Sequence, residues 1–208
     1  MSSQHSIPSS DVSPATVAAI RGPGRPRDAR CDQAILRATL DILREGGVAA
    51  LSIDAVAARA EVGKATIYRR WSSKDVLVLE ALRSDGDPID VPDTGNLRDE
   101  LEVYFDRLIE RFAANDGSDV LPHLIEAACY DADVRASLDE YIKQRQKPLR
   151  SILLRAAQRG DIADDVDRVV MAEALVGPVI YRRLLTGGRI DRAFVRKLLD
   201  IVISTTDR

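Results

Sequence analysis

A short basic stretch, KATIYRR from Lys64 to Arg70, carries the side chains of this chain that are best suited to chemistry. Ile67 is its only large aliphatic residue, so we expect a helix that buries Ile67 and presents the other side chains outward. Ammonium, guanidinium and hydroxyl groups bind phosphates and base edges, and a methyl group packs against thymine. The predicted outer face consists of Lys64, Ala65, Thr66, Tyr68, Arg69 and Arg70. These residue types predict a surface that contacts double-stranded DNA.

The elements around this stretch predict how it is positioned. Ser52 is a good N-cap for a preceding short helix that ends at Ala60, and a turn containing glycine follows at 61–63. Two short helices joined by such a turn form the helix-turn-helix unit, which places its second helix in the major groove. An amphipathic helix from Asp28 to Gly46, stopped by Gly46-Gly47, precedes the unit.

A further helix is predicted from Lys74 to Arg83. Ser72 with Asp75 resembles a capping box for its start. Free backbone amides at a helix N-terminus bind anions, so this end, together with Lys74, is suited to a DNA phosphate.

A short basic segment, Gly24-Arg25-Pro26-Arg27, precedes the first predicted helix. Pro26 fixes its own backbone and moves Arg25 away from helical geometry, so the segment is extended. It resembles the core of the AT-hook motif, in which arginine lies in the narrow minor groove of A·T tracts. A solvated basic linker is the alternative. Because the segment directly precedes a helix-turn-helix, we favour contact of Arg25 and Arg27 with DNA.

The net charge of −3 conceals an uneven distribution. Residues 21–83 contain twelve Lys or Arg against eight Asp or Glu, whereas residues 84–208 contain eighteen against twenty-four. A basic segment attached to an acidic one suggests a polyanion partner for the first segment alone. A chance fluctuation on solvated faces is the alternative, so the charge supports the motif without establishing it.

The composition excludes several classes of protein. No run approaches the roughly 18 consecutive apolar residues of a membrane span, and the residues before Arg21 do not form a secretory signal. Cys31 and Cys129 lie in different predicted domains, and we expect both to be reduced thiols in the cytoplasm. His123 and Cys129 match no closed zinc pattern, so we expect neither a metal nor a cofactor.

The residues after Arg83 predict further helices and no strands. A polar loop rich in Pro, Gly and Asp, 84–95, is the natural domain boundary. Helical patterns then cover 96–114, 120–130, 133–159, 166–186 and 191–205, with kinks expected at Pro148 and Pro178. We therefore expect an all-α protein with a disordered leader at 1–21, a basic arm and three-helix DNA-binding domain at 22–84, and a second helical domain at 85–208.

An extended pattern from Asp28 to Leu82 resembles the DNA-binding domain of the tetracycline-repressor (TetR) family of bacterial transcription regulators. Trp71 stands where that family more often has Phe. The matching segments are Ile35-Leu36-x-Ala38, Gly46-Gly47, Leu51-Ser52-Ile53-x-x-Val56-Ala57, Ala60-x-Val62-Gly63-x-Ala65-Thr66-Ile67-Tyr68-x-x-Trp71 and Lys74-x-x-Leu77. Carried over by position, the resemblance implies DNA contacts from the recognition helix by Lys64, Thr66, Tyr68 and Arg69, a groove-floor position for Ala65, and phosphate contacts by Ser52, Arg70 and Lys74.

The resemblance also implies that residues 85–208 bind a small-molecule effector and form a homodimer through the last two helices, about 166–205. Completion of the intrachain core is the alternative use of their apolar residues. Polar and aromatic residues that would line an effector pocket are Tyr104, Phe105, His123, Glu126, Cys129 and Tyr141. Core or surface packing is the alternative for each of them.

Two other functions fit the sequence less well. Gly63-Lys64-Ala65-Thr66 has a superficial likeness to a phosphate loop, but Ala58 and Ala65 occupy positions where that motif needs Gly and Ser or Thr. A non-specific architectural DNA binder would leave the acidic second half unexplained. We therefore expect no enzyme but a sequence-specific transcriptional regulator, a ligand-responsive repressor that binds an inverted-repeat operator as a homodimer.

Overall fold

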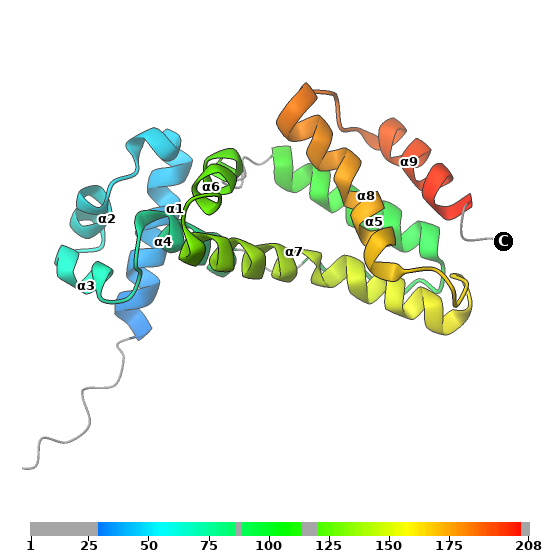
Figure 1. Cartoon of the computed structure of the whole chain (residues 1–208), viewed down its shortest axis with the longest axis horizontal. Helices are drawn as coiled ribbons and strands as arrows, with labels where there is room; N and C mark the ends of the chain where they lie inside the picture. The colour runs from blue at the N-terminus through cyan, green and yellow to red at the C-terminus, as the bar shows by residue number, and fades with distance from the viewer. Residues whose placement is uncertain (1–28, 86–88, 114–119, 205–208) are drawn as a thin grey trace, which may run out of the picture.

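The computed structural model of the chain describes residues 29–85, 89–113 and 120–204. Within these ranges every regular element is a helix, which confirms the all-α prediction. Figure 1 shows two groups of helices at opposite ends of an elongated molecule, with one long helix running between them. The predicted leader and the Gly24–Arg27 arm lie outside the described residues.

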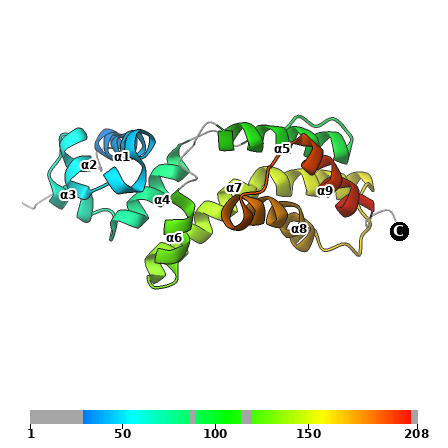
Figure 2. The same cartoon turned by 90° about the horizontal axis from the view of Figure 1, so that it is seen from above.

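The first group is formed by four helices, two of which make up the helix-turn-helix. They are α1 (Ala29–Ala50), α2 (Ile53–Arg59), α3 (Lys64–Tyr68) and α4 (Lys74–Ser84). Regular α-helical geometry breaks inside α1 at Gly47, which has φ 64° and ψ −163°, so the glycine pair interrupts the helix as its sequence predicts. Figure 2 shows α4 leading from α1–α3 toward the second group.

The second group, and the segment that joins it to the first, are formed by the helices after α4. They are α5 (Leu97–Ala113), α6 (Leu121–Ala128), α7 (Ala132–Arg159), α8 (Arg168–Tyr181), the π-helical turn η2 (Arg182–Thr186) and α9 (Arg192–Ser204). The α7 helix continues through Pro148 and ends at Gly160, whose φ of 85° is left-handed. It is the long helix that connects the two ends of the molecule in Figure 1.

The buried side chains form two hydrophobic cores rather than one. The second core joins α5, the later part of α7, α8 and α9. The first core joins α1 to α4, and it also takes in side chains from α6 and the beginning of α7, namely Val120, Leu124, Ala128, Val134 and Leu138. The helix-turn-helix stretch therefore packs on a core that residues far along the chain help to complete.

The structure differs from the sequence prediction at one helix cap, at helix starts and inside one predicted helix. Ser73, not Ser72, caps α4, because its Oγ accepts the backbone N–H of Val76 at 3.2 Å. The α7 helix begins after Asp131 instead of at Asp133, because the Asp131 carboxylate accepts backbone N–H bonds of the first turn.

The start and the continuation of α8 also differ from the prediction. Asp167 caps α8 through the N–H groups of Val169 and Val170, which moves the start from 166 to Arg168. The predicted single helix 166–186 is divided into α8 and η2, and Gly187 ends the π-helical turn with a left-handed φ of 61°. Pro178 lies inside α8.

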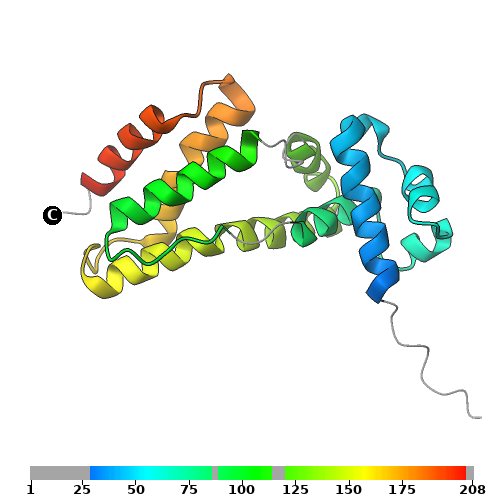
Figure 3. The same ribbon diagram turned by 180° about the vertical axis from the view of Figure 1, so that it is seen from behind.

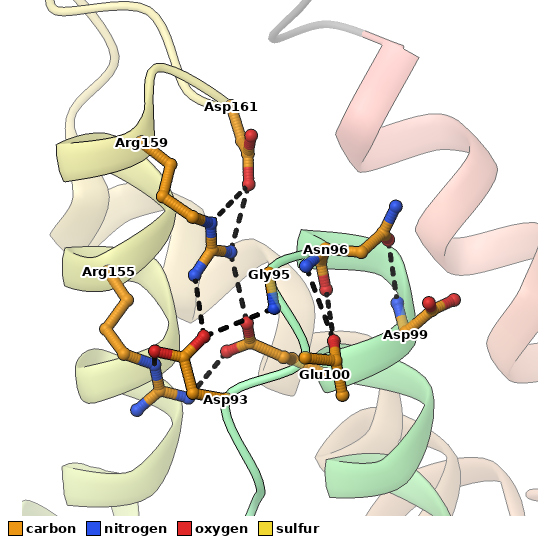
Figure 4. Close-up of polar contacts among 9 residues, drawn as sticks. Asp93, Gly95, Asn96, Asp99, Glu100, Arg155, Arg159 and Asp161 are labelled. Atoms are coloured by element: carbon orange, nitrogen blue, oxygen red, sulfur yellow. Dashed lines mark hydrogen bonds and ion pairs between the residues drawn. The ribbon is translucent and has the colours of Figure 1, made fainter.

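A buried ion-pair cluster fixes the start of α5 against α7. Glu100 is completely buried and binds Arg155 at 2.5 Å and Arg159 at 3.1 Å. Asp93 and Asp161 bind the outer side of Arg159, at 3.2 and 2.9 Å (Figure 4). Figure 3 shows the extended segment before α5 running along α7, and the cluster ties this segment to the helix. The orientation of the second group is thereby set at the end remote from α3.

Candidate DNA-binding surface

Local hydrogen bonds form the α2–turn–α3 unit as the sequence predicts. Ser52 caps α2, because its Oγ accepts the N–H of Ala55 at 3.1 Å. After the C-cap Ala60, the left-handed residue is Glu61, with φ 54°, whereas Gly63 is extended and caps α3. The turn closes through the N–H of Val62, which bonds to the carbonyl of Ala57 at 3.0 Å. The glycine thus does not supply the positive φ of this turn.

The recognition helix α3 has a buried side and an open side. Ile67 is completely buried and Trp71 is 8% exposed, so these two residues anchor the helix to the first core. On the other side Tyr68 is 56% exposed, although a tyrosine ring has much apolar surface to bury. Lys64, Ala65 and Arg69 are also exposed, and Thr66 is half-buried. The structure therefore brings five of the six predicted outer residues onto one accessible surface.

Lys64, the first cationic residue of this surface, forms an ion pair with a carboxylate. Nζ of Lys64 lies 2.6 Å from Oδ1 of Asp54, in the first turn of α2. The hydrogen bond from Lys64 to Asp54, and the negative charge of that carboxylate, raise the pKa of Lys64, so the ammonium group stays charged. No ion pair joins Arg69 or Lys74 to any residue within the described ranges.

Arg70 differs from the other predicted contacts. Its side chain is 17% exposed and forms an ion pair with Asp32 of α1. The same guanidinium group donates a hydrogen bond to Sγ of Cys31 at 3.3 Å. Arg70 therefore connects the end of α3 to the start of α1. Contact between Arg70 and DNA stays a prediction, and a phosphate would have to compete with Asp32 and Cys31 for the guanidinium group. This ion pair was not predicted from the sequence, because Asp32 lies far from Arg70 in sequence.

The α4 helix connects this surface to the rest of the molecule. Lys74 is its first residue, half-buried beside the cap Ser73, and Asp75 follows in contact with His123 of α6 at 3.0 Å. At the other end of α4, side chains of α7 bind its carbonyl groups: Arg145 binds that of Leu82 at 3.2 Å and Gln144 that of Arg83 at 3.3 Å. Both ends of the helix that carries Lys74 are thus held by α6 and α7.

The six predicted effector residues do not converge on one pocket. Tyr104 and Phe105 pack edge-to-face inside the second core, with ring centroids 5.2 Å apart, and burial raises the pKa of Tyr104 to about 12. His123 faces Asp75, whereas Glu126 and Cys129 are exposed on α6. Tyr141 lies under the guanidinium group of Arg145, 5.2 Å from it.

An open groove of about 350 Å³ lies elsewhere, between the end of α5 and the η2 turn. Its two arginines stack on aromatic rings: Arg182 lies 3.8 Å from the ring of Phe194, and Arg183 lies 4.2 Å from the ring of Phe112. The remaining lining residues are Ile109, Ala113, Gly187, Gly188 and Ile190. No signal in the sequence points to these residues, because the groove depends on how η2 turns back over α5.

Metal sites and membrane spans are both absent from the described part of the chain. No group of three or more His, Cys, Asp or Glu side chains is arranged to hold a metal ion there. None of the helices in the same residues has the length and apolar character needed to cross a membrane.

Comparisons with known proteins agree with this architecture. Residues 35–81 match the model of bacterial regulatory proteins of the tetR family, and residues 91–202 match the tetracyclin repressor-like C-terminal domain. The solved structure of the TetR family transcription regulator SCO0332 has a TM-score of 0.74 and 30% identity, and the alignment covers 84% of this chain and 97% of that one.

Two relatives align over most of their length. The transcriptional regulator YdeS of Bacillus subtilis, of helix-turn-helix type, is 32% identical over 85% of this chain and 89% of its own. A protein of Mycobacteroides abscessus named DNA-binding transcriptional repressor TetR is 33% identical over 82% of this chain and 90% of its own. These relatives are regulators and not enzymes. Both halves of the chain match TetR-family models, and its recognition helix α3 is exposed. The chain therefore belongs to the TetR family of bacterial transcription regulators and is a DNA-binding regulator.

Proposed function

We propose that the protein is a ligand-responsive repressor that binds an inverted-repeat operator as a homodimer. The observation that carries the proposal is a set of apolar side chains exposed on α8, η2 and α9. Val169, Val170, Tyr181, Leu185 and Ile201 are each more than half exposed. Large contiguous apolar surface on a folded chain is usually covered by a partner, and a second copy is the commonest one.

A two-fold dimer through α8 and α9 would explain how one short recognition helix reads DNA. The helices α8 and α9 lie at the end of the molecule opposite α3 (Figure 1), so two copies joined there would keep both recognition surfaces free. Dimers of this kind present two helices to major grooves about 34 Å apart on one side of the duplex. Two-fold symmetry in the protein then requires an inverted repeat in the operator.

Regulation by an effector would act through α4. We propose that residues 85–208 bind the effector and dimerise, and that residues 22–84 provide the arm and the DNA-binding domain. The contacts of α4 with His123, Gln144 and Arg145 connect Lys74 to α6 and α7. The dimer would have two conformations, which differ in the spacing of the two recognition helices. An effector that binds more tightly to the conformation with the wrong spacing would shift the population toward it and release DNA.

Repression is the direction favoured by the name of the Mycobacteroides abscessus relative, which is 33% identical. A regulator of this kind would act in the cytoplasm, where it meets its DNA. The six predicted pocket residues and the groove beside η2 are both places to look for effector contacts.

Gel-shift titration with DNA from upstream of the protein's own and neighbouring genes tests operator binding. We expect one fragment to be retarded in the presence of excess unrelated duplex. Equal affinity for every fragment would instead indicate an architectural DNA binder, and the operator proposal would fail.

The dimer is tested separately by Ile201→Glu. The side chain is 68% exposed, so the charge should leave the single chain folded but disrupt the joined face. We expect a dimer for the wild type and a monomer for the variant in sedimentation velocity, with weaker binding to the retarded fragment. The control is Tyr130→Glu on the exposed surface beyond α6, where the side chain is 88% exposed and dimerisation should persist.

A further inference from the structure

The face predicted to meet DNA carries its own acidic groups. Of the four cations placed there within the described residues, Lys64 is paired with Asp54 and Arg70 with Asp32, whereas Arg69 and Lys74 have no ion-pair partner in that part of the chain. The two paired cations differ in accessibility. Arg70 is largely covered, but Lys64 is 58% exposed, so Lys64 remains able to reach a phosphate.

Asp54 is held at the DNA-facing edge by the local fold. It lies in the first turn of α2, two residues after the cap Ser52, and its side chain is 74% exposed. The fold brings this turn beside the first residue of α3, which is Lys64. An exposed carboxylate next to a phosphate-binding ammonium group cancels its charge and repels the phosphate backbone.

We propose that Asp54 is a charge mask that sets the affinity of the protein for DNA of any sequence. In the free protein Asp54 neutralises Lys64. On DNA, Lys64 changes partner from the carboxylate to a phosphate, and such exchange is easy because exposed ion pairs are weak and break readily. The mask keeps the regulator from being retained on bulk DNA by phosphate contacts alone.

The salt dependence of binding reports this exchange. A cation that neutralises a phosphate releases one condensed counterion, which makes the slope of log K against log salt more negative by about 0.9. Asp54 stays beside the bound phosphate and offsets the charge of Lys64, so the pair together displaces fewer counterions from DNA than a lone cation would. The wild-type slope is therefore shallower than the number of phosphate contacts would give.

The opposite role is that Asp54 positions Lys64 for DNA. An ammonium group has three donors, and one bond to Asp54 leaves two for a phosphate. Positioning predicts that loss of the carboxylate weakens binding, whereas masking predicts that it strengthens binding. The sign of one measurement separates the two roles.

The test is Asp54→Asn in the full chain, titrated against a fluorescent duplex of arbitrary sequence between about 50 and 200 mM salt. We expect affinity to rise about five- to tenfold near 0.1 M salt for each DNA-bound face, with a slope steeper by about 0.9 per face. The matched control is Glu140→Gln, which removes the same charge from an exposed pair with Lys143 on α7, 2.8 Å long, and should change neither quantity.

The proposal rests on contact between Lys64 and DNA, which Lys64→Gln tests by itself. If Lys64→Gln leaves affinity unchanged, the placement of Lys64 at DNA fails. If Lys64→Gln weakens binding but Asp54→Asn lowers affinity or leaves affinity and slope unchanged, the placement stands and the mask is overturned.

The double variant identifies the route. We expect Asp54→Asn to give a clearly smaller gain in the Lys64→Gln background than in the wild type, because only the direct repulsion between the carboxylate and the phosphates then remains. An equal gain in the two backgrounds would show that the carboxylate acts by direct repulsion alone and would overturn the mask. Because Asp54 also favours the N-terminus of α2, circular dichroism and thermal unfolding accompany each titration, and Asp54→Ser replaces Asp54→Asn if the latter is not folded.

Discussion

Nε2 of His123 lies 3.0 Å from Oδ1 of Asp75, and this contact joins α6 to the first turn of α4, directly beside Lys74. Their side chains are 38% and 21% exposed, so water reaches the pair. The contact therefore links α6 to the turn of α4 that carries the predicted phosphate contact, Lys74.

We expect His123→Ala to lower the free energy of unfolding by about 0.5 kcal/mol, because partly exposed polar pairs stabilise little. Urea denaturation of His123→Ala, Asp75→Ala and the double variant gives the coupling energy of the pair. A coupling energy of zero would show that the two side chains do not interact in solution.

Tyr68→Ala should weaken operator binding about tenfold, since a good base contact discriminates by about 1–3 kcal/mol. The fold should be unaffected, because Tyr68 is 56% exposed while its neighbour Ile67 carries the core contact. Fluorescence anisotropy measures the affinity, and Tyr68→Phe separates the hydroxyl group from the ring. Unchanged affinity in Tyr68→Ala would remove Tyr68 from the surface.

Replacement of both Arg25 and Arg27 by Ala should reduce affinity most on operators with A·T-rich flanks, since arginine is attracted by the narrow minor groove of such tracts. The measurement compares two duplexes that differ only in their flanks. An identical loss on G·C-rich flanks would contradict the minor-groove arm and leave a purely electrostatic linker.

Glu100→Ala should lower the free energy of unfolding by about 2 kcal/mol. Loss of one partner from a buried ion pair costs about 3–5 kcal/mol. The cost is smaller here because water reaches the side chains of Arg155 and Arg159, which are 28% and 24% exposed. Asp93→Ala is the control: its carboxylate binds the same arginines but is 59% exposed, so the loss should stay below about 0.5 kcal/mol. Equal effects in denaturant titration would contradict the distinction.

The sequence was sufficient for the helices of the DNA-binding surface. Helical periodicity located α1 to α4, and Ser52 and Asn96 cap helices as their types predict. Ser72 and Ser73 are equally good caps by type, however, and only the observed bond to Val76 identifies Ser73. Local signals thus fix an element but not always its first residue.

Contacts between distant segments were beyond sequence reasoning. Arg70 has the type and position of a phosphate contact, but its pairing with Asp32 depends on how α3 crosses α1. Tyr104 likewise has the type of a pocket residue, yet the packing of α5 against α7 buries it in the core. Residue type does not distinguish a side chain that lines a cavity from one that fills it.

The sharing of the first core by α6 and the start of α7 has a consequence for dissection of the chain. A fragment that ends after Arg83 would lose the apolar side chains that Leu124, Val134 and Leu138 provide, and would expose the side of α4 that they cover. The recognition helix therefore owes its stability to segments that follow it by more than fifty residues. Heat or denaturant should melt α3 and α6 together, as one cooperative unit.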